Sequence, residues 1–354
     1  MKPSRSLVLV VTGSIAAVKT LPLIGALRSK NFDVSVILTR APETFGWVTC
    51  DTLRDASVES VLTNVSAEEE KSRLLNGANA VLVAPASADF LSRMTYERSP
   101  FIQAIVNASA SPRHLMVAPA MNTKMWEHPA VQRNVSALNR LGAVILGPVS
   151  GALACGVQGF GRMADPELLA CGSAAACDGQ PHETLAFYDL ARRVKTARPA
   201  FKKNGHILIA LGGRGDEDDV RRLASSVQRS GLTADYVLAP SWKPRAARIA
   251  SIVGQDVVTD YGQVDGLDGL EHIRLPERAG CVFFPFLDQE TAQNAVHGQA
   301  GSLFLALILA SKAPVAAPSS RFAALPSSLA QSLHEDGWVC LDDFHDILAS
   351  RIDL

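Results

Sequence analysis

Short apolar runs alternate with amphipathic stretches through the first half of the chain. The runs are Leu7–Val11, Val34–Leu38, Ala80–Val83, His114–Val117 and Ala143–Leu146. Their length and their Val/Leu-rich composition are typical of buried strands. The stretch Ala16–Lys30 between the first two runs places Leu21, Ile24 and Leu27 on one face of a helix. This alternation predicts an α/β fold with a parallel sheet and helices on both faces.

Turn-forming and polar residues follow these predicted strands. The segments are Gly13-Ser14, Thr39-Arg40, Pro85–Ser87 and Pro119–Asn122. Ligands of parallel α/β sheets bind at the carboxyl ends of the strands. The four segments are therefore expected to meet at one ligand site.

The second half of the chain repeats the order of elements. Its apolar runs are His206–Ala210, Tyr236–Leu238, Cys281–Phe284 and Pro314–Ala317. We place a first domain at 1–175, a helix (Glu183–Lys195) and linker at 176–204, and a second domain at 205–354. The repeated order favours a tandem duplication with a degenerate second copy. The alternative is two unrelated α/β domains.

Charge and cysteine content narrow the partners. The formal net charge of −1 gives no sign of a nucleic-acid or anionic-membrane partner. No apolar stretch reaches the length of about 18 residues that a membrane span needs. The six cysteines form no CxxC pair, which suggests reduced thiols in the cytoplasm. Cys171 and Cys177 have no His at ligand spacing, so no metal site is expected.

Two loops have small residues where a flat ligand could approach the backbone. Gly13 and Ser14 precede a predicted helix, whose dipole favours a phosphate, although such turns also occur as plain connections. Pro85–Ala88 follows a buried strand, and Ser87 can donate a hydrogen bond. Ser87 as a helix N-cap is the competing interpretation.

The segment around Asn122 has a mixed polar and apolar character. The Asn122 amide suits a substrate carboxylate, and Met121, Met125 and Trp126 would form an apolar wall of the substrate site. The alternative is that these three apolar residues belong to the core.

A glycine-rich segment, Gly151–Met163, surrounds Cys155. Four glycines in thirteen residues predict an irregular, mobile flap over a pocket. Cys155 would then be an acid or a nucleophile, or otherwise an inert thiol in a structural loop.

Together these segments resemble the FMN-dependent cysteine decarboxylase family, which acts on phosphopantothenoylcysteine or on peptides. The matching segments are VTGSIAAVKTLPLIGALR (11–28), VLVAPASADF (81–90), VAPAMNTKMWEHPAVQRN (117–134) and GPVSGALACGVQGFGRMADPE (147–167). The resemblance implies a Rossmann-like flavoprotein fold, assembled as trimers, with FMN as cofactor. It also implies a substrate that ends in a cysteine-derived carboxylate.

The resemblance assigns roles to individual residues. Gly13, Ser14 and Ile15 would hold the FMN phosphate, and Asn122 the substrate carboxylate. Thr39, Phe45, Pro85, Ala86, Ser87 and Ala88 would lie near the flavin. Cys155 matches the flap cysteine of members that yield a saturated thiol, although Val157 stands where an Asp is usual.

One family residue is missing from the first half. The catalytic His of a His-Ile-x-Leu segment would fall on Lys71, and no His precedes His114. The second half contains Glu271-His272-Ile273-Arg274-Leu275 instead. We therefore expect His272, with Asn122 and Cys155, to form a composite catalytic site. The acidic turn Asp216–Asp219 repels phosphate and argues against FMN in the second half.

Two further functions stay open. The chain could be a catalytically inactive binding or regulatory flavoprotein, since Lys71 replaces the base. A flavin prenyltransferase or hydride-transfer flavoprotein is a third possibility, against which Asn122 and Cys155 argue.

Overall fold

A computed structural model describes residues 5–39, 42, 46–58, 60–110, 114–153, 156, 158–179, 205–263, 270–311 and 313–341. The chain divides into two compact units. The first comprises Met1–Glu127 and Val131–Val194, and the second His128–Ala130 and Lys195–Leu354. The helix predicted at 183–195 lies outside the described residues. Within the described ranges, no helix is long and apolar enough to cross a membrane.

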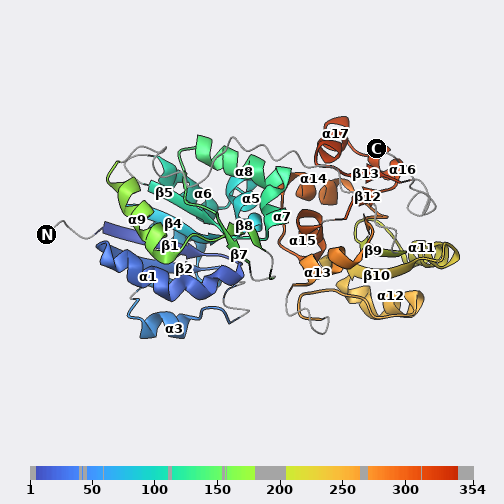
Figure 1. Cartoon of the computed structure of the whole chain (residues 1–354), viewed down its shortest axis with the longest axis horizontal. Helices are drawn as coiled ribbons and strands as arrows, with labels where there is room; N and C mark the ends of the chain where they lie inside the picture. Colours follow the sequence, from blue (N-terminus) through green and yellow to red (C-terminus); the bar gives the residue numbers. More distant parts are fainter. Residues whose placement is uncertain are drawn as a thin grey trace. The chain divides into compact units, whose positions relative to one another are not determined.

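The first unit is built on a six-stranded parallel sheet in the order β3-β2-β1-β4-β5-β6 (Figure 1). The strands are β1 (Arg5–Val11), β2 (Phe32–Leu38), β3 (Val61–Leu62), β4 (Ala80–Ala86), β5 (His114–Pro119) and β6 (Val144–Ile145). The strand order reverses direction at β1, next to β4. A crevice for a ligand forms at such a switch point. The predicted parallel α/β fold is confirmed.

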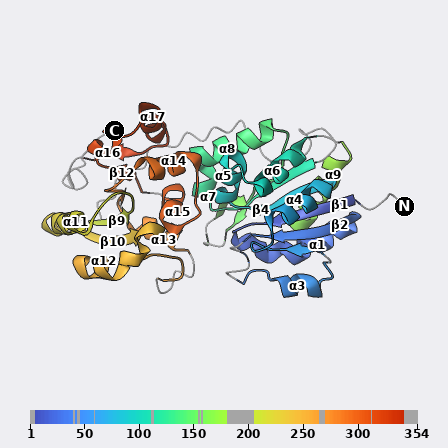
Figure 2. The same cartoon turned by 180° about the vertical axis from the view of Figure 1, so that it is seen from behind.

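Helices cover both faces of this sheet. They are η1 (Ile15–Lys19), α1 (Thr20–Ser29), α3 (Cys50–Asp55), α4 (Glu68–Gly77), α5 (Ala88–Tyr96), α6 (Pro100–Val106), η2 (Asn107–Ser109), α7 (Thr123–Glu127), α8 (Pro129–Arg140) and α9 (Pro166–Cys177). Figure 1 shows α1 and α9 side by side, and Leu23 and Leu169 from these helices share a core with Leu9 of β1. Helices α4 and α5 both pack against α6, seen from behind in Figure 2. Residues alternate between the two faces along each strand, so the continuous apolar runs are buried on both sides.

The glycine-rich segment is a β-hairpin, and the prediction of irregular structure there is wrong. Strand β7 (Val149–Ala152) pairs antiparallel with β8 (Gln158–Arg162). The glycines allow β8 to approach another part of the chain closely, because β8 lies directly against Met121–Thr123. Only a strand without side chains at Gly159 and Gly161 fits there.

The second unit contains a five-stranded parallel sheet in the order β10-β9-β11-β12-β13. Its strands are β9 (His206–Leu211), β10 (Thr233–Leu238), β11 (Val282–Phe283), β12 (Val315–Ala317) and β13 (Val339–Cys340). A parallel bridge pairs Val237 of β10 with Val258. Val258 thus lies beside β10 as β3 lies beside β2 in the first unit. Both units thus have a parallel sheet with the same strand order.

The helices of the second unit follow its strands. They are α11 (Glu217–Arg229), η3 (Pro240–Arg245), α12 (Ala246–Val253), α13 (Glu271–Arg278), α14 (Gln289–His297), α15 (Leu303–Ala310), α16 (Ser319–Ala323) and α17 (Ser327–Glu335). Helix α11 starts with a capping box between Asp216 and Asp219. Helix α15 is apolar along its whole length because nearly all of it is buried.

The ladder registers of the two sheets also correspond. Leu82 of β4 pairs with Leu9 and Met116, and Val282 of β11 pairs with Leu208 and Val315. Counting along the strands from these partners makes three landmarks equivalent: Pro85 and Pro285, Pro119 and Pro318, and Gly13 and Gly212. One register therefore aligns three separate strand ends, as the duplication hypothesis expects.

Candidate functional site

The ends of three strands in the first unit are tied together by hydroxyl groups. The buried Thr12 hydroxyl donates to the Pro85 carbonyl at 2.6 Å and accepts from the Ser87 N–H at 2.9 Å. Both the N–H and the hydroxyl of Thr39 donate to the Val11 carbonyl at 3.0 Å. The turn after β1 and the loop after β4 are therefore held in one fixed arrangement. Sequence analysis did not identify Thr12, although a polar residue that ends an apolar strand was a usable signal.

The turn after β1 is open and carries no acidic group. Gly13 is exposed, and the Ile15 side chain is 48% exposed. The Ser14 hydroxyl caps η1 by accepting from the Ala16 N–H at 3.4 Å. Neither η1 nor α1 has an acidic residue in its first turn. Such a turn at a positive helix end suits an anion.

The loop after β4 presents only small side chains. Ala86 and Ala88 are buried, and no side chain larger than a methyl group extends from either position. The Ser87 hydroxyl accepts from the Phe90 N–H at 3.2 Å, so Ser87 is the N-cap of α5, as the competing interpretation had it. A hydroxyl that accepts a hydrogen bond keeps its own proton to donate. The loop is thus closely packed except at Ser87, which is half-buried and keeps one donor.

Asn122 begins the short helix α7. Its side-chain oxygen accepts from the Lys124 N–H at 2.8 Å, and its carbonyl accepts from the Trp126 N–H at 2.9 Å. The oxygen end of the Asn122 amide therefore faces the backbone of α7. Met125 and Trp126 are buried, as the core interpretation predicts, whereas Met121 is half-buried.

The β7–β8 hairpin is joined to the Asn122 segment. The Met121 N–H donates to the Gly161 carbonyl at 2.9 Å. A Cβ at Gly161 would lie 2.2 Å from the Met121 carbonyl oxygen, and one at Gly159 would lie 2.3 Å from Thr123 Oγ1. The predicted flap and the predicted carboxylate-binding amide thus lie together. Cys155, which lies between β7 and β8 in the sequence, and Phe45 lie outside the described residues.

Lys71, at the position of the family histidine, is buried in α4. Its ammonium lies 3.4 Å from the Asn64 carbonyl oxygen and 5.3 Å from the centroid of the Phe101 ring. A carbonyl acceptor and a cation–π contact stabilise a charged lysine. Lys71 therefore has a structural role in the packing of α4 on α6.

His272 lies on α13 of the second unit. Its ring meets Tyr261 edge-on, with centroids 5.5 Å apart, and its Nδ1 is buried without a hydrogen-bond partner in the described part of the chain. Burial lowers the pKa of His272 to about 4. The imidazole is therefore neutral at neutral pH, which is the form that can accept a proton.

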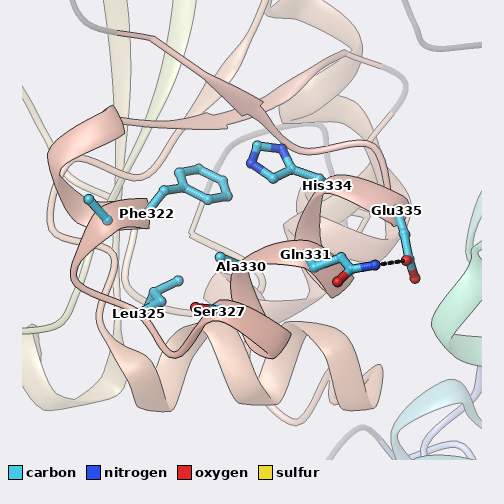
Figure 3. Close-up of a pocket in the computed structure, with 8 residues that line it drawn as sticks. Phe322, Leu325, Ser327, Ala330, Gln331, His334 and Glu335 are labelled. Carbon is cyan, nitrogen blue, oxygen red and sulfur yellow. Dashed lines mark hydrogen bonds between the residues drawn. The ribbon is translucent and has the colours of Figure 1, made fainter.

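A pocket of about 610 Å³ lies in the second unit between α16 and α17 (Figure 3). Its wall includes the rings of Phe322 and His334, stacked with centroids 4.8 Å apart. Gln331 donates to Glu335 across the rim at 3.0 Å. None of the residues that sequence analysis selected lines it. Among the described residues, no cluster of His, Cys, Asp and Glu could hold a metal ion.

The first half of the chain is similar to known proteins. Residues 1–173 match the Flavoprotein family model. The coenzyme A biosynthesis bifunctional protein CoaBC of Haemophilus influenzae is 36% identical over 167 residues, which are 46% of this chain and 41% of that protein. CoaBC of Mycobacterium tuberculosis is 32% identical over 267 residues, 74% of this chain and 57% of the relative. The chain thus spans about half the length of these relatives, and the second match extends past residue 173.

Solved structures also resemble the first part of the chain. A PPC decarboxylase mutant complexed with pantothenoylaminoethenethiol is 24% identical, with a TM-score of 0.40, and the match covers 48% of this chain and 95% of that one. The FMN binding protein AtHal3 is 25% identical, with a TM-score of 0.42, covering 51% and 100%. The match to the Flavoprotein family model covers 173 of the 354 residues. The two sequence relatives above are named as bifunctional proteins of coenzyme A biosynthesis.

Proposed function

We propose that the first unit binds FMN and catalyses the oxidative decarboxylation of a cysteine-derived carboxylate. The observation that supports this most is local. The family match covers residues 1–173, and within them an open, acid-free turn, a small-residue loop and an amide lie at the strand ends. The sequence relatives act in coenzyme A biosynthesis by name, and one similar structure is a PPC decarboxylase.

The described residues fit FMN at this edge of the sheet. Gly13, Ser14 and Ile15 would hold the phosphate, because their turn is exposed and lies at a positive helix end. The flavin ring would lie against Pro85–Ala88, because the alanine side chains there would allow a flat ring to approach the backbone closely. Thr39 and Phe45 would complete the flavin site. FMN supplies a two-electron acceptor for the thiol side of cysteine, and the resulting C=S group makes loss of CO₂ easier.

The protein side chains would bind the substrate and move protons. Asn122 would hold the carboxylate through its NH₂ group, with Met121 and Met125 as the apolar neighbours proposed from the sequence. Cys155, which lies between β7 and β8 in the sequence, would donate a proton, and the two electrons taken up by FMN would have to return to the product to give a saturated thiol. His272 is proposed as the proton acceptor, because burial keeps its imidazole neutral.

Two substrates suit this chemistry, 4′-phosphopantothenoylcysteine and a peptide that ends in cysteine. The proposal includes a trimer-based assembly in the cytoplasm. The test is to supply the full chain with FMN, incubate it with each compound separately, and identify the products by mass spectrometry. Loss of CO₂ from at least one of them is expected. Protein with bound flavin that leaves both compounds intact would overturn the decarboxylase proposal.

That last outcome defines the second candidate function, a catalytically inactive flavoprotein. The contacts of Lys71 favour it, because the side chain at the position of the family histidine is engaged with the Asn64 carbonyl and the Phe101 ring. A binding role would be supported if the protein bound flavin without turnover and if substitution of His272 or Asn122 left the amount of bound flavin unchanged.

A further inference from the structure

We propose that the second unit binds no flavin, because its own side chains occupy the place that FMN takes in the first unit, so that each chain carries one FMN. This inference rests on the proposed function in one respect only, the placement of FMN at the strand ends of the first unit. Its evidence is the alignment of the two sheets and the contacts of the second unit's own side chains.

The ladder registers define the equivalent positions. Alignment of Pro85 with Pro285 places Phe286 where the first unit has Ala86. The same register places Arg321 at the position of Asn122. A methyl group beside the proposed ring site is thus replaced by a phenyl ring, and the carboxylate-binding amide by a guanidinium.

Phe286 and Trp242 pack together against the turn that follows β9. Their rings stack with centroids 5.7 Å apart and an angle of 16° between the planes, and both side chains are buried. The indole N–H donates to the Gly213 carbonyl at 3.1 Å. A Cβ at Gly215 would lie 2.5 Å from the Phe286 ring. The aromatic pair therefore packs directly on the turn after β9, and an isoalloxazine ring has no room there.

Two arginines enclose this stack. The Arg245 guanidinium lies 5.3 Å from the Trp242 ring centroid, and the Arg321 guanidinium lies 5.8 Å from that of Phe286. Arg245 also donates to the Gly215 carbonyl at 3.4 Å. Cation–π contacts at partly desolvated rings add to the stability of the stack. Arg321, which is equivalent to the proposed carboxylate-binding Asn122, is thus engaged with the Phe286 ring.

Acidic residues also follow Gly212–Arg214, which the register makes equivalent to the proposed phosphate residues Gly13–Ile15. The Asp216 side chain accepts from the Asp219 N–H at 2.8 Å, and the Asp219 side chain accepts from the Asp216 N–H at 3.1 Å. The hydrogen bond from the Asp216 N–H lowers the pKa of Asp219, so Asp219 is a carboxylate at neutral pH. These N–H groups already have anionic acceptors, and Glu217 and Asp218 add further negative charge. A phosphate would be repelled from this turn.

The test is the ratio of bound FMN to chain in the full-length protein, measured by absorbance after excess FMN is removed. One FMN per chain is expected, and two would overturn the inference. A ratio of zero would instead contradict the proposed function and leave the second unit flavin-free, so the two failures are distinguishable.

Variants locate the single flavin. Ala86→Phe places in the first unit the phenylalanine that the second unit has at the equivalent position 286. Ser14→Asp adds a carboxylate, and aspartate caps a helix as well as serine does. Both are expected to lower the ratio at least tenfold. Arg321→Asn, the matched change in the second unit, should leave it at one. The inference would be overturned if a folded Ser14→Asp protein kept one FMN per chain while the Arg321→Asn protein lost it. That result would place the flavin in the second unit.

Discussion

The Thr12 hydroxyl accepts a hydrogen bond from the Ser87 N–H at 2.9 Å, and this contact joins the ends of β1 and β4. The same hydroxyl donates to the Pro85 carbonyl at 2.6 Å. These two strands border the point at which the strand order reverses, where a parallel sheet opens a crevice. One buried side chain therefore fixes the relative position of the proposed phosphate turn and the proposed ring loop.

Replacement of Thr12 by valine should weaken both the fold and FMN binding. Valine keeps the shape of threonine but leaves the Ser87 N–H and the Pro85 carbonyl without this partner. A buried polar group that loses its partner costs about 1–3 kcal/mol. Urea unfolding of the apoprotein and fluorescence titration with FMN would measure the two effects. Thr12→Ser keeps the hydroxyl and is the control; a loss as large as that of Thr12→Val would show that the methyl group, and not the hydrogen bonds, matters.

Gly161→Ala should displace the hairpin from the Asn122 segment. The added Cβ would lie 2.2 Å from the Met121 carbonyl oxygen, and the residue has φ of +135°. Overlap with backbone of this kind is expected to destabilise the first unit by about 1–3 kcal/mol. Thermal unfolding and the protease sensitivity of the hairpin would report it.

Gly156→Ala is the matched change within the same hairpin. Gly156 also has a positive φ, of +81°, but a Cβ there would meet nothing within 4 Å. Its effect should therefore be confined to backbone strain of about 1–2 kcal/mol, without loosening of the hairpin. Equal protease sensitivity of the two variants would contradict the proposed contact with Met121.

Burial of His272 makes the stability of the second unit depend on pH. Its pKa is lowered to about 4 in the folded protein, from 6.5 in an exposed histidine, so the unfolded chain binds the proton more readily between these values. The contribution of the neutral imidazole is present above about pH 6.5 and is lost as the pH falls towards 4. Urea unfolding at several pH values should show this decline, and His272→Asn should make it shallower. An identical pH profile in the variant would mean that His272 is not desolvated.

Much of the fold could be predicted from the sequence because apolar periodicity follows strand and helix geometry directly. The strands predicted at Val34–Leu38 and His114–Val117 agree with β2 (Phe32–Leu38) and β5 (His114–Pro119) to within two residues. The two-residue strands β3 and β13 were missed, since Val61–Leu62 and Val339–Cys340 are too short to show a period.

The hairpin was missed for a different reason. Glycine in a sequence indicates freedom of the backbone, but Gly159 and Gly161 are required by contact with Met121–Thr123, which lies far away in the chain. Tertiary contacts of this kind leave no local pattern. The stack of Phe286 on Trp242 likewise joins two separate loops. The sequence did contain one sign of this stack. The first unit has Ala86 after Pro85, whereas the second has Phe286 after Pro285 at the end of the equivalent strand.

The central claim is that the first unit holds a carboxylate through Asn122 and releases CO₂ from it. The most direct test compares CO₂ release by the FMN-loaded wild type and by Asn122→Asp, with substrate labelled in the carboxyl carbon. Aspartate preserves the acceptor for the Lys124 N–H, and hence the start of α7, but replaces the NH₂ donor by a negative charge. Loss of a charge-assisted hydrogen bond together with repulsion predicts a rate lower by about a hundredfold or more. Equal rates in the two proteins would contradict the claim.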